Sequence, residues 1–252
     1  MSSAPVVPIG GDANPNETGF EGFRGEVASR QLTEWLPDEP IHILDISRDS
    51  HRLLQPMLAG GHHVVHVDTE IRQPDIARDP GTGSLSIVRA DRLALDWLPE
   101  ESVDAIVAEG GTLSEALAAE VTVEHLFQLL RPGGRLLASV DSLVAGLGRL
   151  ADAGKWAELA DVPAADVVLV PEDEGRVSRC FWPEELHGML TGAGFSVEWI
   201  RPRTVLAEET VAHALESDRT RLDALVTTEL ALELQRQGES VGRELVTSAR
   251  RP

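Results

Sequence analysis

The stretch ILDISRDSHRLLQPMLAGGHHVVHVD, residues 43–68, decides the fold of this chain. It opens with a short apolar run that ends on Asp45, and residues 52–59 follow with the apolar spacing of a helix. Gly60-Gly61 supplies a helix end, and a second apolar run then closes on Asp68. A strand, a helix and a strand in this order predict two parallel strands joined by a right-handed crossover.

The same alternation continues toward the C-terminus. Further strands are expected at residues 85–89, 103–108, 135–140, 195–200 and 244–249. Helices are expected at residues 25–36, 113–130, 183–190 and 218–237, and around Trp156. This pattern predicts an α/β fold: a doubly wound, mostly parallel seven-stranded sheet with helices on both faces. The last strand, inserted beside the sixth, is expected to run antiparallel.

One domain is expected over residues 25–252, after a flexible segment at residues 1–24 that is rich in Gly, Pro, Asn and Ser. Residues 141–182 form a long connection that could cap a substrate pocket. Four aromatic residues are candidates for lining it: Trp156, Phe181, Trp182 and Trp199. The helix at 218–237 has an apolar stripe that packing on the sheet explains, although a homodimer is an alternative.

Charge and cysteine content narrow the function classes. The 252 residues carry a formal net charge of −20, which repels nucleic acid phosphates and anionic lipid, so we expect neither as a partner. The single cysteine, Cys180, fits a reducing compartment and reads as a small core residue rather than a nucleophile. Neither a secretory signal nor a membrane span is recognisable, so we expect a cytoplasmic protein.

Acidic residues follow four of the expected strands. Asp45, Asp68, Asp91 and Glu109 each come at or just after the end of one strand. In a doubly wound sheet, ligands bind outside the carboxyl ends of the strands. Although a single acid at a strand end is commonly just solvated, four in equivalent places indicate a ligand site.

Other chemistries lack their motifs. His62, His63 and His66 with Asp68 suggest a metal, but strand spacing spreads them too far for one ion, so no metal site is expected. The chain has neither the Gly-x-Ser-x-Gly elbow of serine hydrolases nor the phosphate loop of nucleotide hydrolases. A dinucleotide-binding glycine fingerprint after the first strand is equally absent.

From residue 41 onward the chain resembles the class I S-adenosylmethionine (SAM)-dependent methyltransferases. Residues 43–68 resemble the first strand, cofactor loop, helix and second strand of that family. The segments RADRLALDWLPEESVDAIVAE (89–109), EHLFQLLRPGGRLLASV (124–140) and FWPEELHGMLTGAGFSVEWIRP (181–202) resemble its later elements. The resemblance implies that Asp68 binds the ribose hydroxyls and that Asp91, with Arg92 beside it, contacts the adenine amino group. Glu109 would face the methyl donor or the substrate and could act as a general base.

The cofactor loop departs from the family pattern. The family has acid-x-Gly-x-Gly-x-Gly, and here Asp45 is followed by Ser47, Asp49 and His51 at the glycine positions. Glycines there let the backbone approach the methionine part of SAM. Ser47 is nearly small enough to keep a place in the cofactor site, whereas Asp49 adds bulk and negative charge near the ligand carboxylate unless Arg48 compensates. The loop therefore argues against ordinary tight binding of SAM.

Two functions follow from the sequence. The first is a SAM-dependent methyltransferase that acts on a small molecule by direct methyl transfer. The alternative is a catalytically inactive protein of this fold with a regulatory, scaffolding or ligand-sensing role, paired with a protein partner. The four acids favour a nucleoside ligand in either case.

Overall fold

The computed structural model describes residues 19–48, 51–69, 83–165, 167–171 and 175–252, with no side-chain description for His51. The unit that opens the fold is β1 (His42–Asp45), α2 (His51–Ala59) and β2 (His63–Asp68). β1 and β2 pair in parallel, as the sequence predicts. Gly61, with φ of 80°, adopts the left-handed conformation that ends α2.

The described residues form a nine-stranded sheet in which five strands are parallel neighbours in the order β3-β2-β1-β4-β5. The other strands of this group are β3 (Ser84–Arg89), β4 (Val103–Ala108) and β5 (Leu130–Ser142). β9 (Glu244–Arg250) lies antiparallel between β5 and β8 (Ser196–Arg203), which confirms the expected antiparallel last strand. The doubly wound, mostly parallel arrangement is therefore confirmed.

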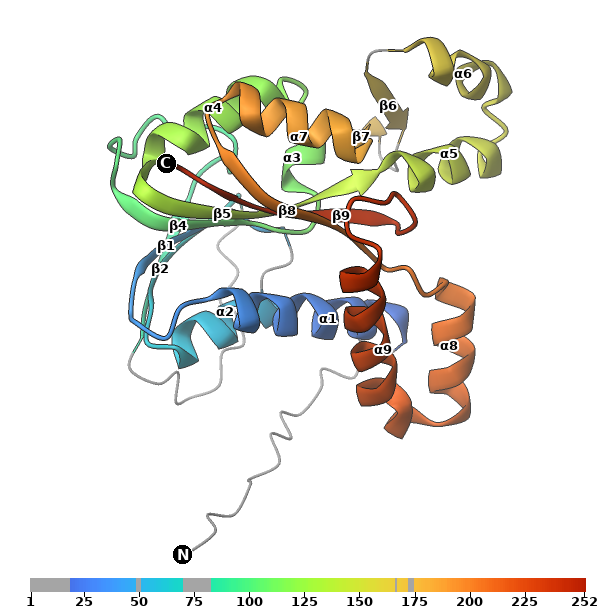
Figure 1. The fold of residues 1–252 in the computed structure, drawn as a ribbon, viewed down its shortest axis with the longest axis horizontal. Coiled ribbons are helices and arrows are strands. Elements are labelled where there is room, and N and C mark those ends of the chain that lie inside the picture. The colour runs from blue at the N-terminus through green and yellow to red at the C-terminus, as the bar shows by residue number, and fades with distance from the viewer. Residues whose placement is uncertain (1–18, 49–50, 70–82, 166, 172–174) are drawn as a thin grey trace, which may run out of the picture.

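Two strands beyond the expected seven come from the long connection. β6 (Val168–Pro171) and β7 (Val177–Phe181) pair antiparallel, and β7 joins the end of β5 in parallel at Asp141 and Ser142. The sequence reading missed them because the strands are short and stand among Pro and acidic residues. α5 (Leu143–Asp152) and α6 (Trp156–Asp161) complete this connection, which projects from one end of the sheet in Figure 1.

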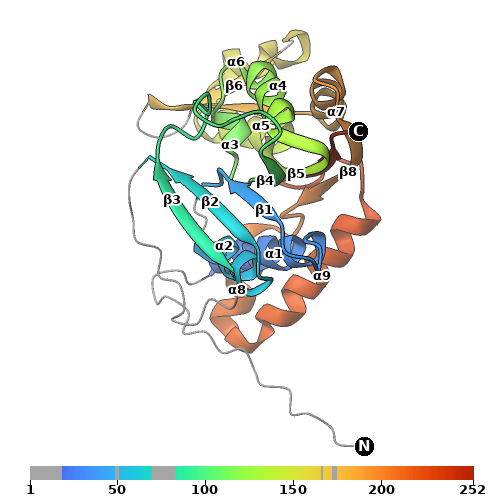
Figure 2. The same cartoon turned by 90° about the vertical axis from the view of Figure 1, so that its left-hand side faces the viewer.

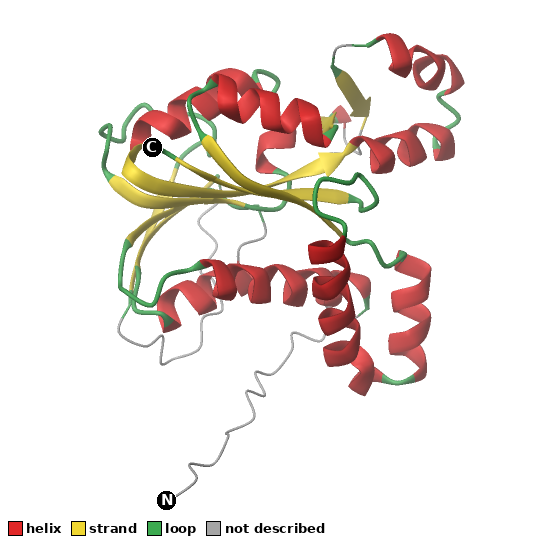
Figure 3. Ribbon diagram, in the orientation of Figure 1, coloured by secondary structure: helices red, strands yellow, loops and turns green. Residues whose placement is uncertain are grey.

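Helices cover both faces of the sheet, as Figures 1 and 3 show. α1 (Phe20–Trp35) and α2 lie on one face, and Figure 2 shows them behind β1, β2 and β3. α4 (Ala119–Leu129) and α7 (Pro183–Gly192) lie on the other. Each face has its own core of buried Leu, Ile and Val side chains. No described helix is long and apolar enough to cross a membrane.

Several element boundaries differ from those expected. α1 starts at Phe20, so part of the segment expected to be flexible is helical, and residues 1–18 lie outside the described residues. The helix expected at 113–130 is two helices, α3 (Thr112–Glu115) and α4. Residues 131–134, between the expected helix and the expected strand, lie inside β5, where the register with β4 shifts.

The C-terminal helix packs differently from the expectation. α9 (Leu222–Gln235) buries Val226 against α1 and α8 (Glu208–Ser217) rather than laying its whole apolar stripe on the sheet. Leu234, which belongs to the apolar stripe of this helix, is 56% exposed, whereas Glu229 and Glu233 are buried. The apolar stripe does not predict which side chains of α9 are buried, because Glu229 and Glu233 accept hydrogen bonds inside the protein. A homodimer through this helix stays a prediction.

Candidate functional site

The four acids expected at strand ends do lie at one edge of the sheet. Asp45 ends β1 and is in register with His66 of β2, while Asp68 ends β2 and is in register with Arg89 of β3. Asp91 follows β3, and Glu109 directly follows β4. The parallel strand directions bring the acids together, but their side chains have different surroundings.

Asp45 has both carboxylate oxygens engaged inside the protein. The side chain is fully buried, and its Oδ1 accepts a hydrogen bond from the Ser47 amide at 3.0 Å. Its Oδ2 accepts one from His66 Nδ1 at 2.9 Å. Although burial favours the neutral imidazole, the hydrogen bond and charge of Asp45 raise the pKa of His66 above its usual value. Asp45 therefore organises the loop after β1, and a direct contact with a cofactor stays a prediction.

Ser47 joins the end of β1 to the end of β4. Its hydroxyl accepts a hydrogen bond from the Glu109 amide at 3.0 Å and contacts the Val107 carbonyl at 3.4 Å. The backbone ladder also continues beyond β1, because the Arg48 amide donates to the Glu109 carbonyl at 2.9 Å. Glycine at position 47 would lack the two hydroxyl contacts and keep the backbone hydrogen bond. The carboxyl edge between β1 and β4 is therefore closed by hydrogen bonds from both the Ser47 side chain and the backbone.

Asp49, the second residue at a glycine position of the family, lies outside the described residues. The third, His51, begins α2.

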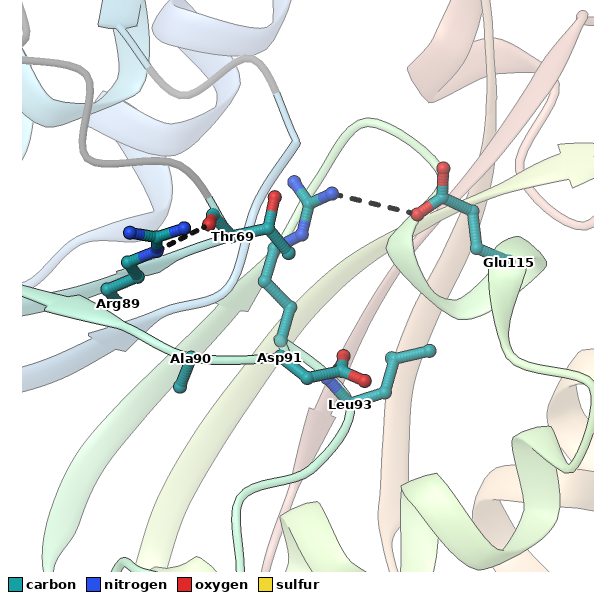
Figure 4. Close-up of a pocket in the computed structure, with 7 residues that line it drawn as sticks. Thr69, Arg89, Ala90, Asp91, Leu93 and Glu115 are labelled. Carbon is teal, nitrogen blue, oxygen red and sulfur yellow. Dashed lines mark hydrogen bonds and ion pairs between the residues drawn. The ribbon is translucent and has the colours of Figure 1, made fainter. Parts of the chain in front are cut away.

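A pocket of about 510 Å³ opens beside the carboxyl end of β3 (Figure 4). Its lining residues are Thr69, Arg89, Ala90, Asp91, Arg92, Leu93 and Glu115. Asp91 is exposed there, and its Oδ1 accepts a hydrogen bond from the Leu93 amide at 2.9 Å. Arg89 Nε donates to the Thr69 carbonyl at 3.3 Å, which fixes the wall between the ends of β2 and β3. Of the residues proposed for cofactor binding, Asp91 and Arg92 line this pocket.

An ion-pair triad crosses the same edge. Glu115, on α3, lies 2.7 Å from Arg48 and 3.8 Å from Arg92, measured between carboxylate oxygen and guanidinium nitrogen. Figure 4 shows the Glu115 carboxylate extending from α3 toward the loop after β3. From the sequence, Arg48 is expected only as a compensating charge, and Glu115 is not expected at the site. The one sign of Glu115 is an acid shortly after the fourth strand, which does not stand out in a chain with 42 acidic residues.

Glu109 does not line that pocket, and its carboxylate belongs to a buried charge network. Its two carboxylate oxygens accept hydrogen bonds from Arg203, at 2.5 and 3.2 Å. Arg203 ends β8 and also donates from Nε to Glu244 at 2.7 Å and from Nη1 to Gln31 at 3.0 Å. Arg24 forms a further ion pair with Glu244. The catalytic role of Glu109 stays a prediction, and its carboxylate already has two charged hydrogen bonds.

Burial and ion pairing shift the pKa values of this network in opposite directions. Burial opposes ionisation of Glu244, but Arg203 and Arg24 lower the pKa of Glu244 to about 2. Likewise burial disfavours the charged guanidinium, while Glu109 and Glu244 raise the pKa of Arg203. Sequence reasoning missed Arg203, since a single arginine near a strand end carries no distinguishing pattern.

None of the four candidate aromatic residues lines the pocket beside β3. Phe181 is fully buried in the core under α7, and Trp199 stacks with Arg201, whose guanidinium carbon is 4.2 Å from the ring centroid. Trp156 and Trp182 are 66% and 42% exposed. Cys180 is fully buried in the core of the 141–182 connection, as expected. That this connection caps a substrate stays a prediction.

Comparisons with known proteins identify the fold. No family model matches the chain, and no curated protein matches it by sequence. Solved structures do match the chain in fold. A 1,6-didemethyltoxoflavin-N1-methyltransferase from Burkholderia thailandensis, with bound 1,6-didemethyltoxoflavin and S-adenosylhomocysteine, is 18% identical, with 99% of this chain and 93% of that chain covered and a TM-score of 0.56.

Two further structures agree. A SAM-dependent methyltransferase from Mesorhizobium loti is 17% identical, with 91% of this chain and all of that chain (100%) covered and a TM-score of 0.55. One from Archaeoglobus fulgidus is 14% identical, with coverages of 91% and 96% and a TM-score of 0.56. The chain therefore has the class I SAM-dependent methyltransferase fold. At these identities the likeness establishes the fold alone.

Proposed function

We propose that this protein binds SAM, with the adenosine part in the pocket beside β3, and transfers its methyl group to a small molecule. The observation that carries the proposal is the pocket of about 510 Å³ lined by Asp91, at the carboxyl edge where Asp68 ends the neighbouring strand. Carboxylates suit the hydrogen-bond donors of adenosine, namely the adenine amino group and the ribose hydroxyls.

The residues present fit the nucleoside half of SAM. Asp91 is exposed at the pocket, with Oδ1 held by the Leu93 amide so that the carboxylate is oriented. Asp68 is partly exposed at the end of β2. In this arrangement Asp91 receives the adenine amino group and Asp68 the ribose.

Methyl transfer here depends on positioning. SAM supplies an electrophilic methyl group, and the protein has to hold the acceptor atom in line with it. Because Arg203 holds both oxygens of Glu109, we expect an acceptor whose attacking atom already has a free lone pair at neutral pH. Such an acceptor requires no carboxylate base. The neighbour from Burkholderia thailandensis, an N-methyltransferase of a small molecule, is compatible with this acceptor class.

A second function is favoured by the closed edge between β1 and β4. Ser47 and the Arg48–Glu109 backbone hydrogen bond close the edge toward which the methionine half of SAM would extend from the proposed adenosine site. A protein that binds the nucleoside there without transferring the methyl group would serve as a ligand sensor. Such a sensor would bind SAM without forming a methylated product.

Calorimetry with SAM and S-adenosylhomocysteine tests the proposal. We expect binding in the micromolar range, and Asp91→Asn should weaken it roughly tenfold, the loss expected for a charged hydrogen bond. Asp96→Asn is the matched control, because the Asp96 side chain is 95% exposed and does not line the pocket. No heat at millimolar ligand would refute the proposal.

Turnover separates the two functions. The protein is incubated with SAM and a panel of small amines, thiols and aromatic nitrogen heterocycles, and formation of S-adenosylhomocysteine is followed. Product that depends on one acceptor supports methyl transfer. Binding of SAM with no product from any acceptor favours the sensor.

A further inference from the structure

Arg48, Arg92 and Glu115 form a triad whose members come from three separate segments. Arg48 follows β1, Arg92 follows β3, and Glu115 lies on α3 after β4. One oxygen of Glu115 lies 2.7 Å from Arg48 and the other lies 3.8 Å from Arg92. A single carboxylate therefore sits between two guanidinium groups.

The three side chains of the triad are partly buried. The side chains of Arg48, Arg92 and Glu115 are 29%, 18% and 25% exposed. Partial burial strengthens ion pairs relative to fully solvated ones, and the remaining exposure leaves room for exchange with a solute. The Glu115 carboxylate has no other partner among the described residues.

The triad also borders the site proposed for adenosine. Arg92 and Glu115 line the pocket beside β3, and Arg48 lies next to Ser47 at the loop after β1. An adenosine ligand with an amino-acid tail, seated at Asp91, would extend its tail along this edge toward Arg48. Its carboxylate would then meet the same guanidinium that Glu115 holds.

We propose that Glu115 is an internal competitor for the ligand carboxylate, which displaces it from Arg48 when an adenosyl amino-acid thioether binds. This inference rests on the proposed function. Because Glu115 is tethered beside Arg48, its effective concentration is high, and the ligand gains only the difference between two carboxylates. Glu115 thereby lowers the affinity for ligands that carry the carboxylate more than the affinity for ligands with the adenosine part alone.

The test compares two probes on the full chain. S-Adenosylhomocysteine carries the amino-acid tail, whereas 5′-methylthioadenosine has the same adenosine and thioether without it. Glu115→Gln should raise the affinity for S-adenosylhomocysteine roughly three- to tenfold and leave that for 5′-methylthioadenosine within about twofold. Glu124→Gln is the matched control, because Glu124 is exposed on the neighbouring α4 and the variant removes the same charge.

One arginine substitution, made alone and together with Glu115→Gln, tests the mechanism. Arg48→Gln alone should weaken S-adenosylhomocysteine more than 5′-methylthioadenosine. The double variant Arg48→Gln with Glu115→Gln should not show the gain in affinity for S-adenosylhomocysteine that Glu115→Gln gives alone. The Arg48 variant also keeps the inference testable if Glu115→Gln unfolds, which circular dichroism would reveal.

The outcomes separate this inference from the function on which it rests. If 5′-methylthioadenosine binds but neither Glu115→Gln nor Arg48→Gln changes the ratio of the two affinities, the inference is overturned and the adenosine site stands. An equal gain from Glu115→Gln and Glu124→Gln would mean general charge repulsion and also overturns it. If neither probe binds any variant, the proposed function and this inference both fail.

Discussion

Glu109 and Arg203 are joined by two contacts, with Oε2 2.5 Å from Nη2 and Oε1 3.2 Å from Nη1, and each side chain is only 3% exposed. The pair links the residue after β4 to the last residue of β8. Glu244, the first residue of β9, binds the same guanidinium. Three strand ends are thus fastened by one buried cation.

Glu109→Gln should therefore act on stability. Removing one partner of a buried pair leaves Arg203 incompletely compensated, and we expect a loss of about 3 kcal/mol in the free energy of unfolding, measured with urea. Glu208→Gln is the control, because its pair with Arg243 is half exposed and should change stability by less than about 1 kcal/mol. Normal stability with abolished methyl transfer would instead assign Glu109 a catalytic role.

Glu233 should make stability depend on pH. Burial raises the pKa of Glu233 to about 8, Gln31 donates to its Oε2, and its Oε1 is buried without a partner in the described part of the chain. Between the ordinary value of 4.5 and about 8 the unfolded chain releases this proton and the folded one keeps it. The contribution of Glu233 is thus fully present below pH 4.5 and is lost as the pH rises to about 8.

Urea midpoints measured at intervals from pH 5 to pH 8 check this. Glu233→Gln should show a flatter profile than the natural chain and should be the more stable of the two at the alkaline end. The exposed Glu239→Gln should follow the natural profile. Superimposable profiles for all three proteins would contradict the assignment.

His66 should titrate above its ordinary pKa of 6.5, because Asp45 stabilises the charged ring despite burial. The stabilising contribution is complete below pH 6.5 and is lost as the pH rises through the raised folded-state pKa. Proton NMR of the imidazole resonances measures this pKa directly. Asp45→Asn should bring it down, and an unchanged titration in that variant would show that the pair does not form in solution.

Ser47→Ala should cost about 1–2 kcal/mol of stability, because the Glu109 amide loses its acceptor. Ser47→Gly should cost about 1 kcal/mol more through added backbone freedom in the unfolded chain. Both variants loosen the edge between β1 and β4, so we expect both to bind S-adenosylhomocysteine more tightly than the natural chain. Thermal unfolding and calorimetry measure the two effects, and tighter binding of Ser47→Gly alone would implicate the backbone instead of the hydroxyl.

The mostly parallel sheet and the common edge of the four acids could be predicted from the sequence. Apolar runs ending in acids identify the strands, and parallel pairing then places their ends together. Which carboxylate remains available to a ligand could not be predicted. That depends on partners from distant segments: Arg203 is 94 residues from Glu109, and His66 is 21 residues from Asp45.

The interior of α9 shows the same limit. Its sequence predicts an apolar face, yet Glu229 is buried, because its carboxylate accepts hydrogen bonds from the Val205 and Leu206 amides at 2.7 and 2.9 Å. Those amides lie in a loop that no periodic pattern marks. The local spacing of apolar residues predicts helices and strands. The hydrogen-bond partners of buried polar groups depend on how distant segments pack in the folded chain.

β7 of the 141–182 connection pairs with the end of β5 at two residue pairs, Asp141 with Cys180 and Ser142 with Phe181. Because these pairs lie beyond most of the β5–β9 ladder, the rest of the connection can be lengthened, shortened or exchanged without shifting the register of the strands that carry the four acids. With the predicted capping role, the residues around a methyl acceptor can vary during evolution while the sheet stays the same.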